Sequence, residues 1–342
     1  MTIFKEQSIQ CPQDYIHTHE IKGSKSGAYM VLADEILKDL YPEIFPLDTV
    51  FIPAGEDTKT MSRLEWILEE MGRRGLHRKS VLYVVGGGTL TDVGGLAAGL
   101  YMRGIDHVFI PTTLLAMVDA SIGGKCGINF HGAKNRIGML KHPKEILADV
   151  RFLETQNDAD FADGLVEALK VAALFQRKLW DQMRLYIQED WQKHRQTLGK
   201  LSVPGASMEK IKIVERDFEE KGIRTLLNVG HTLGHALEEA SDHQLSHGKA
   251  VAMGLVYESE LPFSQPNVAR DFREIFLQLY GETGCSIKLE RERLEAALYK
   301  DKKMEGGEFL FPYIVDMGRG EMKKVDAQWL FQTLIDGYFK DQ

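Results

Sequence analysis

Short apolar runs alternate with amphipathic stretches through the first half of the chain, and this alternation constrains the fold more than any other feature of the sequence. The runs are apolar at successive positions, which is typical of strands buried on both faces of a sheet. Residues 61–71 and 92–100, which lie between runs, have helical spacing. This order predicts a parallel sheet wrapped by helices. The predicted strands are residues 29–33, 50–52, 81–85 and 108–110.

The pattern changes after about residue 160, where helical spacing dominates. The predicted helices are residues 161–175, 179–191, 208–220, 231–239 and 249–260. One segment, residues 308–315, has strand character, and Pro312 within it favours an edge ribbon. A chain of 342 residues is long enough for two domains. We therefore predict an α/β domain over residues 1–158 and a mainly helical domain over residues 159–342.

The charge balance limits the kinds of partner. Lys and Arg number 42 and Asp and Glu number 50, which gives a net charge of −8. Bulk charge of this sign does not attract nucleic acid or an anionic membrane, so an anionic ligand needs a local basic cluster. Three scattered cysteines (Cys11, Cys126 and Cys285) suggest a reducing compartment. With no signal-peptide pattern and no long apolar run, we expect a soluble cytoplasmic protein with no nucleic-acid or membrane partner.

Two glycine turns follow predicted strands. Gly86, Gly87 and Gly88 come directly after the strand at residues 81–85 and precede a predicted helix. Backbone N–H groups at such a helix start can bind a pyrophosphate. The spacing is not that of the usual dinucleotide fingerprint, and a turn that needs glycine only for its backbone is an equal alternative. The second turn, residues 55–59, follows the strand at residues 50–52, and the pair favours a nucleotide site.

Histidines in the second half form a candidate metal site. His231 and His235 are four residues apart, so on a helix they share one face and can converge on a metal or a substrate. Ordinary core or capping roles are the alternative. His247 stands before a glycine at another predicted helix start, and Glu167 could add the carboxylate of a mixed zinc site. The alternative role for Glu167 is a helix-surface ion pair with Lys170.

The segment from Arg103 to Asn135 is rich in Thr, Gly, Lys, Asn and Arg, which bind phosphate and hydroxyl oxygens. It has no P-loop spacing, and a solvated loop is the alternative interpretation.

Blocks in constant order and spacing over residues 34–303 resemble the 3-dehydroquinate synthases, within the wider group of sugar phosphate cyclases. The matching blocks are Gly55-Glu56-x-x-Lys59, Gly86-Gly87-Gly88-x-x-x-Asp92, Tyr101-x-Arg103-Gly104, Pro111-Thr112-Thr113, Val118-Asp119-x-Ser121-x-Gly123-Gly124-Lys125, Lys134-Asn135, Gly164-x-x-Glu167-x-x-Lys170, Lys210 with Asp217 and Glu220, Arg224-x-Leu-Leu-Asn228-x-Gly-His231-Thr-x-Gly-His235, His247-Gly248 and Asp301-Lys302-Lys303.

The resemblance implies a Rossmann-like α/β nucleotide-binding domain and a mainly α-helical metal-binding domain. It also implies a homodimeric lyase that uses NAD and Zn2+, or Co2+, to convert 3-deoxy-D-arabino-heptulosonate 7-phosphate (DAHP) to 3-dehydroquinate and phosphate, a step toward chorismate. Glu167, His231 and His247 would be the metal ligands. The residues implied for NAD are Asp34, Gly55, Glu56, Lys59, Gly87, Gly88, Thr89, Asp92, Thr112, Thr113, Lys134, Phe152 and Thr155.

The same resemblance assigns the substrate groups. Phosphate would be bound by Lys125, Asn135, Lys170 and Asn228, with Arg103 supplied by the neighbouring subunit. Lys210 and Arg224 would bind the carboxylate, Asp119 would orient a ring hydroxyl, and His235 with Glu220 would handle protons.

Four positions depart from the family pattern: Ala54, Ala133, Phe218 and Lys249. They leave open another sugar phosphate cyclase, acting on an amino analogue or on sedoheptulose 7-phosphate. Two further alternatives are a metal- and NAD-dependent polyol or glycerol-phosphate dehydrogenase and a non-catalytic relative. Arg224 favours a carboxylate-bearing substrate, because its guanidinium can bind a carboxylate in a bidentate manner.

Overall fold

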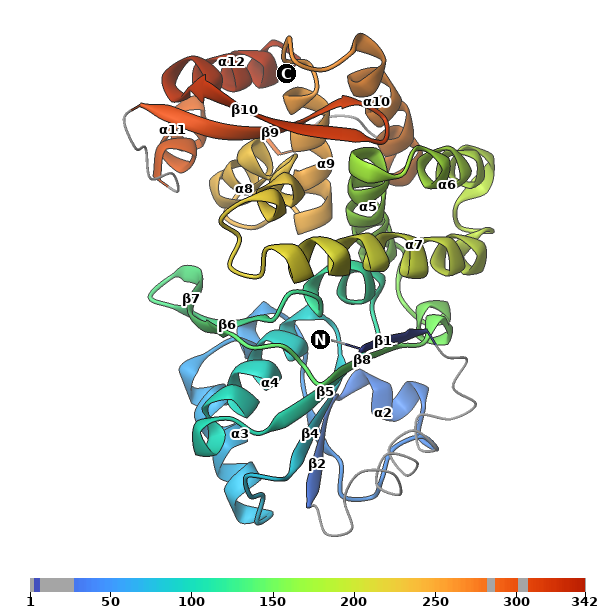
Figure 1. The fold of residues 1–342 in the computed structure, drawn as a ribbon, viewed down its shortest axis with the longest axis vertical. Helices are drawn as coiled ribbons and strands as arrows, with labels where there is room; N and C mark the ends of the chain where they lie inside the picture. The colour runs from blue at the N-terminus through green and yellow to red at the C-terminus, as the bar shows by residue number, and fades with distance from the viewer. Residues whose placement is uncertain (1–2, 7–27, 282–286, 301–306, 342) are drawn as a thin grey trace. The chain divides into compact units, whose positions relative to one another are not determined.

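The computed structural model describes residues 3–6, 28–281, 287–300 and 307–341. Two compact units divide the chain, residues 1–157 and residues 158–342, and each is described by itself (Figure 1).

The N-terminal unit is built on a six-stranded parallel sheet in the order β1-β8-β5-β4-β2-β3. The four predicted strands are confirmed, whereas β1 and β8 were not predicted. β8 is buried along its whole length, but it has only four residues and begins with an acidic one. The strands are β1 (Ile3–Glu6), β2 (Tyr29–Asp34), β3 (Val50–Ile52), β4 (Val81–Gly86), β5 (Asp106–Pro111) and β8 (Glu145–Ala148).

Helix α4 (Gly88–Leu100) packs against β4 and β5, and α3 (Met61–Arg73) lies beside α4 (Figure 1). The close approach of α4 to β4 depends on a glycine in the helix, since a Cβ on Gly94 would lie 2.7 Å from a methyl group of Val84. A third helix, α2 (Ile36–Leu40), is short. The unit also contains an antiparallel ribbon of β6 (Lys125–Phe130) and β7 (Ala133–Leu140). The alternative interpretation of this segment as a solvated loop was therefore wrong.

The C-terminal unit is mainly helical, as predicted. The predicted helix at residues 208–220 corresponds to the end of a longer one, α7, which begins at Arg195, contains Pro204 and ends at Arg216, four residues earlier than predicted. Pro204 and Gly205, two residues that are unfavourable inside a helix, hide the helical period. The predicted ribbon is confirmed, with Pro312 opposite Met322. The elements are α5 (Asp158–Phe175), α6 (Arg177–Asp190), α7 (Arg195–Arg216), α8 (His231–Ala240), α9 (His247–Glu258), α10 (Pro266–Tyr280), α11 (Arg291–Lys300), β9 (Glu308–Asp316), β10 (Arg319–Asp326) and α12 (Ala327–Lys340).

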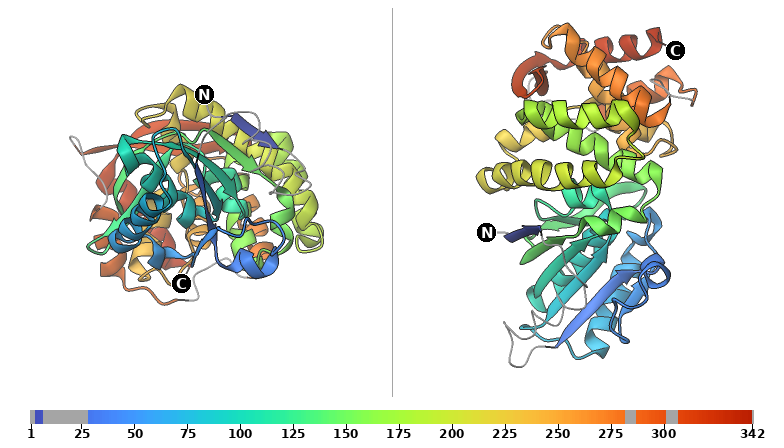
Figure 2. Two further views of the ribbon diagram at one scale, coloured as in Figure 1. Left: turned by 90° about the horizontal axis from the view of Figure 1, so that it is seen from below. Right: turned by 90° about the vertical axis from the view of Figure 1, so that its right-hand side faces the viewer.

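Helix α5 is the centre of the C-terminal unit. It contacts α6, α7, α9 and both strands of the ribbon, and α6 packs against α7 (Figure 2). Every residue from 161 to 174 is buried, including Asp163, Glu167 and Lys170. Because burying a charge is costly unless it is paired, these three side chains need partners within the unit.

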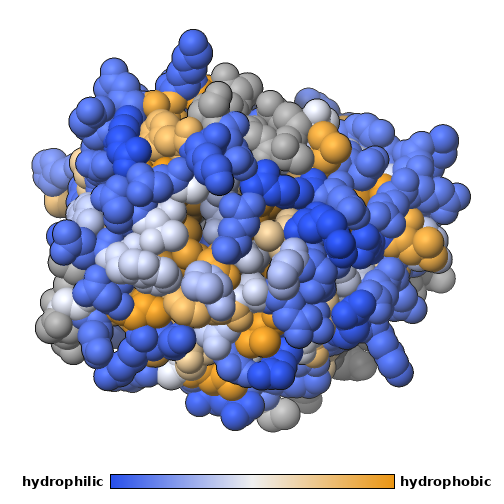
Figure 3. Space-filling model, turned by 90° about the horizontal axis from the view of Figure 1, so that it is seen from above, coloured by the Kyte–Doolittle hydropathy of each residue, from blue (hydrophilic) through white to orange (hydrophobic). Residues whose placement is uncertain are grey.

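Hydrophilic residues predominate on the face drawn in Figure 3, and the hydrophobic ones form small separate groups. Among the described segments, no helix has both the length and the apolar character needed to cross a membrane.

Candidate functional site

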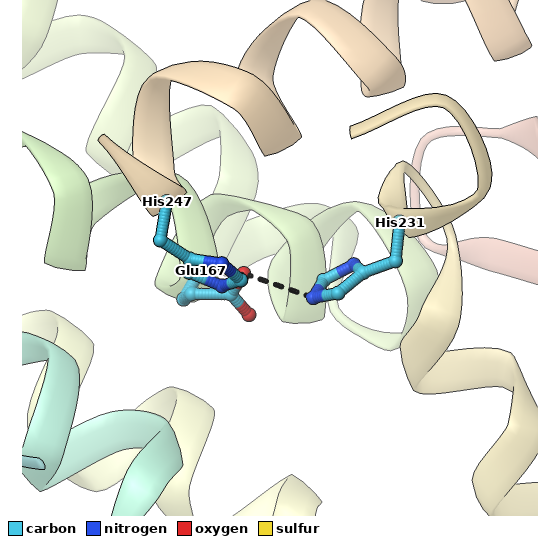
Figure 4. Close-up of side chains that lie close together, drawn as sticks. All are labelled: Glu167, His231 and His247. Atoms are coloured by element: carbon cyan, nitrogen blue, oxygen red, sulfur yellow. Dashed lines mark ion pairs between the residues drawn. The ribbon is translucent and has the colours of Figure 1, made fainter. Parts of the chain in front are cut away.

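Three side chains from three helices of the C-terminal unit point toward one another: Glu167 of α5, His231 of α8 and His247 of α9 (Figure 4). One ligand atom from each lies within 4.8 Å of the other two. The Nε2 atoms of both histidines are 3.6 Å from Oε1 of Glu167. Two imidazoles and one carboxylate are a ligand set typical of catalytic zinc. The structure thus brings together the three residues that were expected to bind metal.

Each histidine of this candidate site is the first residue of its helix, and its Nδ1 atom has a partner. Nδ1 of His231 lies 3.1 Å from the carbonyl oxygen of Val229, and Nδ1 of His247 lies 3.4 Å from Oε2 of Glu238. Both partners can only accept, so these contacts place a proton on Nδ1. Nε2 is then the nitrogen directed at Glu167, which is the arrangement of metal-ligating histidines.

Glu167 has the properties of a cation ligand. Its side chain is fully buried, and Oε1 has no hydrogen-bond partner in the part of the chain that the structure describes. Burial alone would raise the pKa of Glu167, but Lys170, His231 and His247 hold it well below its usual range. Lys170 is 1% exposed and lies 2.5 Å from Oε2. The surface ion pair considered from the sequence is therefore wrong, because both charges are buried.

The two ligand histidines differ in charge. Burial and the nearby Lys170 ammonium hold the pKa of His231 well below its usual range. Burial would also lower the pKa of His247, but Glu167 and Glu238 raise it to about 10. At neutral pH the ring of His247 is therefore protonated, and a cation that binds there must displace this proton.

His235 lies one turn after His231 on α8, outside the triad. Its ring centroid is 5.0 Å from that of His231 and 6.1 Å from that of His247. The side chain is exposed. An exposed imidazole beside the candidate cation site can exchange protons with solvent.

A second group of predicted residues gathers around η5 (Ile223–Asn228). The Nδ2 atom of Asn228 donates to Oε1 of Glu220 at 2.8 Å, and Nε of Arg224 lies 3.9 Å from Oε2 of the same carboxylate. Arg224 is 3% exposed and also donates to the carbonyl oxygen of Phe218 at 2.8 Å. Lys210 of α7 is buried as well. Arg224 and Lys210 thus add two buried cations to that of Lys170 in this unit.

Polar side chains of the N-terminal unit converge on the buried ammonium of Lys59. It donates to Oδ2 of Asp92 at 2.7 Å and to Oδ1 of Asn135, and it lies 3.7 Å from Glu56. Asn129, which the sequence did not single out, donates to Oε1 of Glu56 at 2.8 Å and accepts the N–H of Asn135 at 2.9 Å. Burial raises the pKa of Asp92 to about 6, although Lys59 stabilises the charged form of the carboxylate.

The glycine turn after β4 lies where the strand order reverses. β2 and β4 are neighbours, and the following strands add to opposite sides of this pair, which is where ligands bind in open parallel sheets. Asp34 ends β2 at this point. A Cβ on Gly87 would lie 3.2 Å from Cγ2 of Thr113, and one on Gly88 would lie 3.1 Å from Cβ of Ala120. The start of α4 therefore keeps a bare backbone that a phosphate can approach.

The remaining predicted residues of the N-terminal unit are spread more widely. The N–H of Gly55 lies 3.3 Å from Oγ1 of Thr89, which links the two glycine turns. Phe152 and Thr155 both contact Tyr41, with ring centroids 5.1 Å apart and hydroxyls 2.9 Å apart. The others are Thr112 after β5, Arg103 in η2 (Tyr101–Arg103), Asp119 in η3 (Ala116–Ala120), Lys125 at the start of β6 and Lys134 in β7.

Sequence reasoning missed four residues that contact the predicted site residues or the segments that carry them. They are Asp163, Glu238 and Glu258 in the C-terminal unit and Asn129 in the N-terminal unit. One signal could have found Asp163, since it lies four residues before Glu167 on an otherwise apolar helix. The matched block Asp301-Lys302-Lys303 lies outside the described residues, as do Cys11 and Cys285. Cys126 is a buried free thiol.

The fold defines the class of protein. A solved structure of 2-epi-5-epi-valiolone synthase from Streptomyces hygroscopicus, with NAD+ and Zn2+ bound, superposes with a TM-score of 0.86. The alignment covers 100% of this chain and 98% of that one, at 24% sequence identity. This likeness establishes the two-part fold of a Rossmann-like unit and a helical unit.

The sequence comparisons identify the family. Residues 49–163 match the family model of the 3-dehydroquinate synthase N-terminal region, and residues 164–304 match that of the C-terminal region. The 3-dehydroquinate synthase of Saccharolobus solfataricus is 36% identical over 86% of this chain and 84% of its own. That of Caldanaerobacter subterraneus is 33% identical over 94% of this chain and 92% of its own. The chain belongs to the 3-dehydroquinate synthase family.

Proposed function

We propose that this chain is a lyase that converts DAHP to 3-dehydroquinate and inorganic phosphate, with NAD+ and a divalent cation as cofactors. The observation that carries the proposal is the convergence of Glu167, His231 and His247, in which Oε1 of Glu167 is buried with no hydrogen-bond partner among the described residues. The relatives that share the family are named for this activity.

The donor set fits zinc, with cobalt as an alternative. Two Nε2 atoms and one carboxylate oxygen face a common point, and each Nδ1 has an outer partner. Residues 159–342 form the proposed metal- and substrate-binding domain. When bound, zinc lowers the pKa of a substrate hydroxyl, and NAD+ accepts a hydride and later returns it.

The side chains near the triad have roles in proton transfer and in binding. His235 and Glu220 form the proposed proton-handling pair, because His235 is exposed beside the triad and Glu220 is held by Asn228. Arg224 and Lys210 are proposed to bind the substrate carboxylate, since both are buried cations. The proposed phosphate ligands are Lys170 and Asn228 of this unit, Lys125 and Asn135 of the N-terminal unit, and Arg103 of the neighbouring subunit.

Residues 1–158 form the proposed NAD-binding domain. The bare backbone at Gly87 and Gly88 would meet the pyrophosphate, and Lys59 would add a cation. Asp34, at the end of β2, is proposed to bind a ribose hydroxyl. Asp119 is proposed to orient a ring hydroxyl of the substrate. The other proposed NAD contacts are Gly55, Glu56, Thr89, Asp92, Thr112, Thr113, Lys134, Phe152 and Thr155.

A homodimer in the cytoplasm is part of the proposal. It is supported by the expected use of Arg103 from a second subunit, and gel filtration with light scattering checks the oligomeric state.

A substrate panel tests the proposed activity. DAHP, sedoheptulose 7-phosphate and glucose 6-phosphate are each incubated with enzyme, NAD+ and Zn2+, and released phosphate is measured. We expect release from DAHP, because the guanidinium of Arg224 can bind a substrate carboxylate in a bidentate manner. Preferred release from either neutral sugar phosphate would instead assign the chain to another cyclase activity, in line with Ala54, Ala133, Phe218 and Lys249.

A further inference from the structure

Among the buried carboxylates that lie outside the ligand triad and outside the proposed substrate groups, two adjoin the starts of α8 and α9. Asp163 on α5 is 8% exposed, and Glu258, the last residue of α9, is 2% exposed. Burying a carboxylate is costly unless hydrogen bonds compensate for lost water. The partners of these two side chains therefore indicate what they do.

Glu258 binds the start of α8 on both sides of His231. Its Oε2 accepts the N–H of Gly230 at 2.7 Å, and its Oε1 accepts the N–H of Leu233 at 2.9 Å. The first N–H groups of a helix have no acceptor within the helix, and the helix dipole favours a negative charge there. One carboxylate therefore fixes the backbone that carries the first ligand histidine.

Close backbone packing brings α8 within reach of Glu258. Gly254 lies one turn before Glu258 on the same face of α9. A Cβ on Gly254 would overlap the carbonyl oxygen of Gly230, and Gly230 itself has a φ of +78°. Both glycines are needed for the approach, because neither the space nor the backbone conformation suits a larger residue.

Asp163 contacts the start of α9, the helix that carries the second ligand histidine, as Glu258 contacts the start of α8. Its Oδ1 accepts the hydroxyl of Ser246 at 3.0 Å and that of Tyr280 at 2.8 Å. Ser246 caps the start of α9 directly before His247. On the other side of His247, a Cβ on Gly248 would overlap Asp163. Asp163 is thus packed against both neighbours of His247.

The two contacts join the three ligand helices in sequence. Asp163 and Glu167 are four residues apart on α5, so one face of this helix carries both a ligand and a contact to the start of α9. The far end of α9 then holds the start of α8 through Glu258. We propose that Asp163 and Glu258 are positioning residues that fix His247 and His231 relative to Glu167 before the cation binds. This inference rests on the metal site of the proposed function.

Metal binding to the full-length protein tests the inference. Zn2+ is removed by a chelator, and its affinity is measured by competition with a chromophoric chelator for the unmodified protein, Glu258→Gln and Asp163→Asn. The visible absorption of the Co2+-loaded proteins reports ligand geometry. Asp271→Asn is the matched control, because Asp271 is also buried in this unit, at 4% exposed, but pairs with Arg184.

We expect Glu258→Gln and Asp163→Asn to lower Zn2+ affinity by about tenfold or more and to change the Co2+ spectrum. Asp271→Asn should keep both properties even if its melting temperature falls. Unchanged affinity and spectra in the two test variants would overturn the inference alone. An unmodified protein that binds no Zn2+ would overturn both the inference and the proposed metal site.

A milder variant covers the case in which a carboxamide variant does not fold. Ser246→Ala removes the hydroxyl that Asp163 accepts and keeps the buried carboxylate. It should weaken Zn2+ binding by a smaller factor and shift the Co2+ spectrum in the same direction as Asp163→Asn. Affinity and spectrum identical to those of the unmodified protein would contradict the role of Asp163.

Discussion

The two units build their candidate sites by different means. In the N-terminal unit the predicted residues lie mostly in turns that follow strands, and a bare backbone at Gly87 and Gly88 forms part of the site. In the C-terminal unit the proposed metal ligands come from the interior of α5 and from the first residues of α8 and α9. Their positions depend on buried side-chain contacts between helices. The first site is thus a property of local turns, and the second is a property of helix packing.

This difference predicts which changes affect only one site. A substitution in the N-terminal turns should alter nucleotide binding and leave metal binding unchanged. A substitution among the ligand helices should do the reverse. The predictions below test this separation in order of decreasing effect.

Removing a metal ligand should have the largest effect. In His231→Ala we expect Zn2+ affinity to fall by more than about a hundredfold, beyond the cost of losing an outer partner, and turnover to disappear. NAD+ binding and the circular dichroism spectrum should stay unchanged. Metal analysis after dialysis measures the retained zinc. The control is His194→Ala, which removes a histidine that pairs with Glu189. Stoichiometric zinc in His231→Ala would show that His231 is not a ligand.

Arg224 tests the substrate part of the C-terminal unit. In Arg224→Ala we expect the keto-acid substrate to bind about a hundredfold more weakly, because a buried charged partner is lost. Inorganic phosphate, used as a competitive inhibitor, should bind nearly as before. Inhibition and KM measurements on the same preparation check this. Equal weakening of both ligands would contradict the assignment of Arg224 to the carboxylate.

Lys59 tests the N-terminal unit. Lys59→Met removes the cation that pairs with Asp92, and we expect NAD+ to bind about tenfold more weakly, the cost of one charge-assisted hydrogen bond. Zn2+ retention should not change. A fluorescence titration with NAD+ measures the effect, and Lys144→Met, which breaks an exposed pair with Asp106, is the control. Loss of zinc in Lys59→Met would break the proposed separation of the two sites.

His107 should have the smallest effect on function and a clear effect on acid stability. Its ring is fully buried in β5, and neither nitrogen has a hydrogen-bond partner among the described residues. Burial and the charge of Lys141 lower its pKa from 6.5 to about 4, against the opposing effect of Asp106. A lowered pKa in the folded state means that protonation favours unfolding, so stability present above pH 6.5 is lost as the pH falls toward 4.

His107→Phe should remove this loss. The difference in free energy of unfolding between His107→Phe and the unmodified protein should grow by up to about 3 kcal/mol between pH 7 and pH 4. Both proteins contain Asp92, whose raised pKa acts in the opposite direction, so its contribution cancels. Urea unfolding across this pH range gives the difference. A constant difference would show that His107 does not titrate in the folded protein.

The sequence predicted the parts of the molecule whose signals are local. Four strands and the glycine turns were found because each is a contiguous apolar run or turn. The start of α7 was missed because Pro204 and Gly205 hide its period. The contacts of Asp163 and Glu258 could not be found in this way, because Glu258 accepts backbone N–H groups at the start of α8 and Asp163 accepts the hydroxyls of Ser246 and Tyr280, which belong to other segments of the chain. Such contacts depend on tertiary packing and leave no repeated spacing in the chain.

The ratio of phosphate released to NADH accumulated, in one incubation of enzyme, Zn2+, NAD+ and DAHP, tests most directly whether both sites serve a single reaction. Because the proposed reaction returns the hydride to the product, many phosphates should be released per enzyme while the NADH absorbance stays flat. Steady accumulation of NADH without phosphate release would contradict the lyase and identify a dehydrogenase.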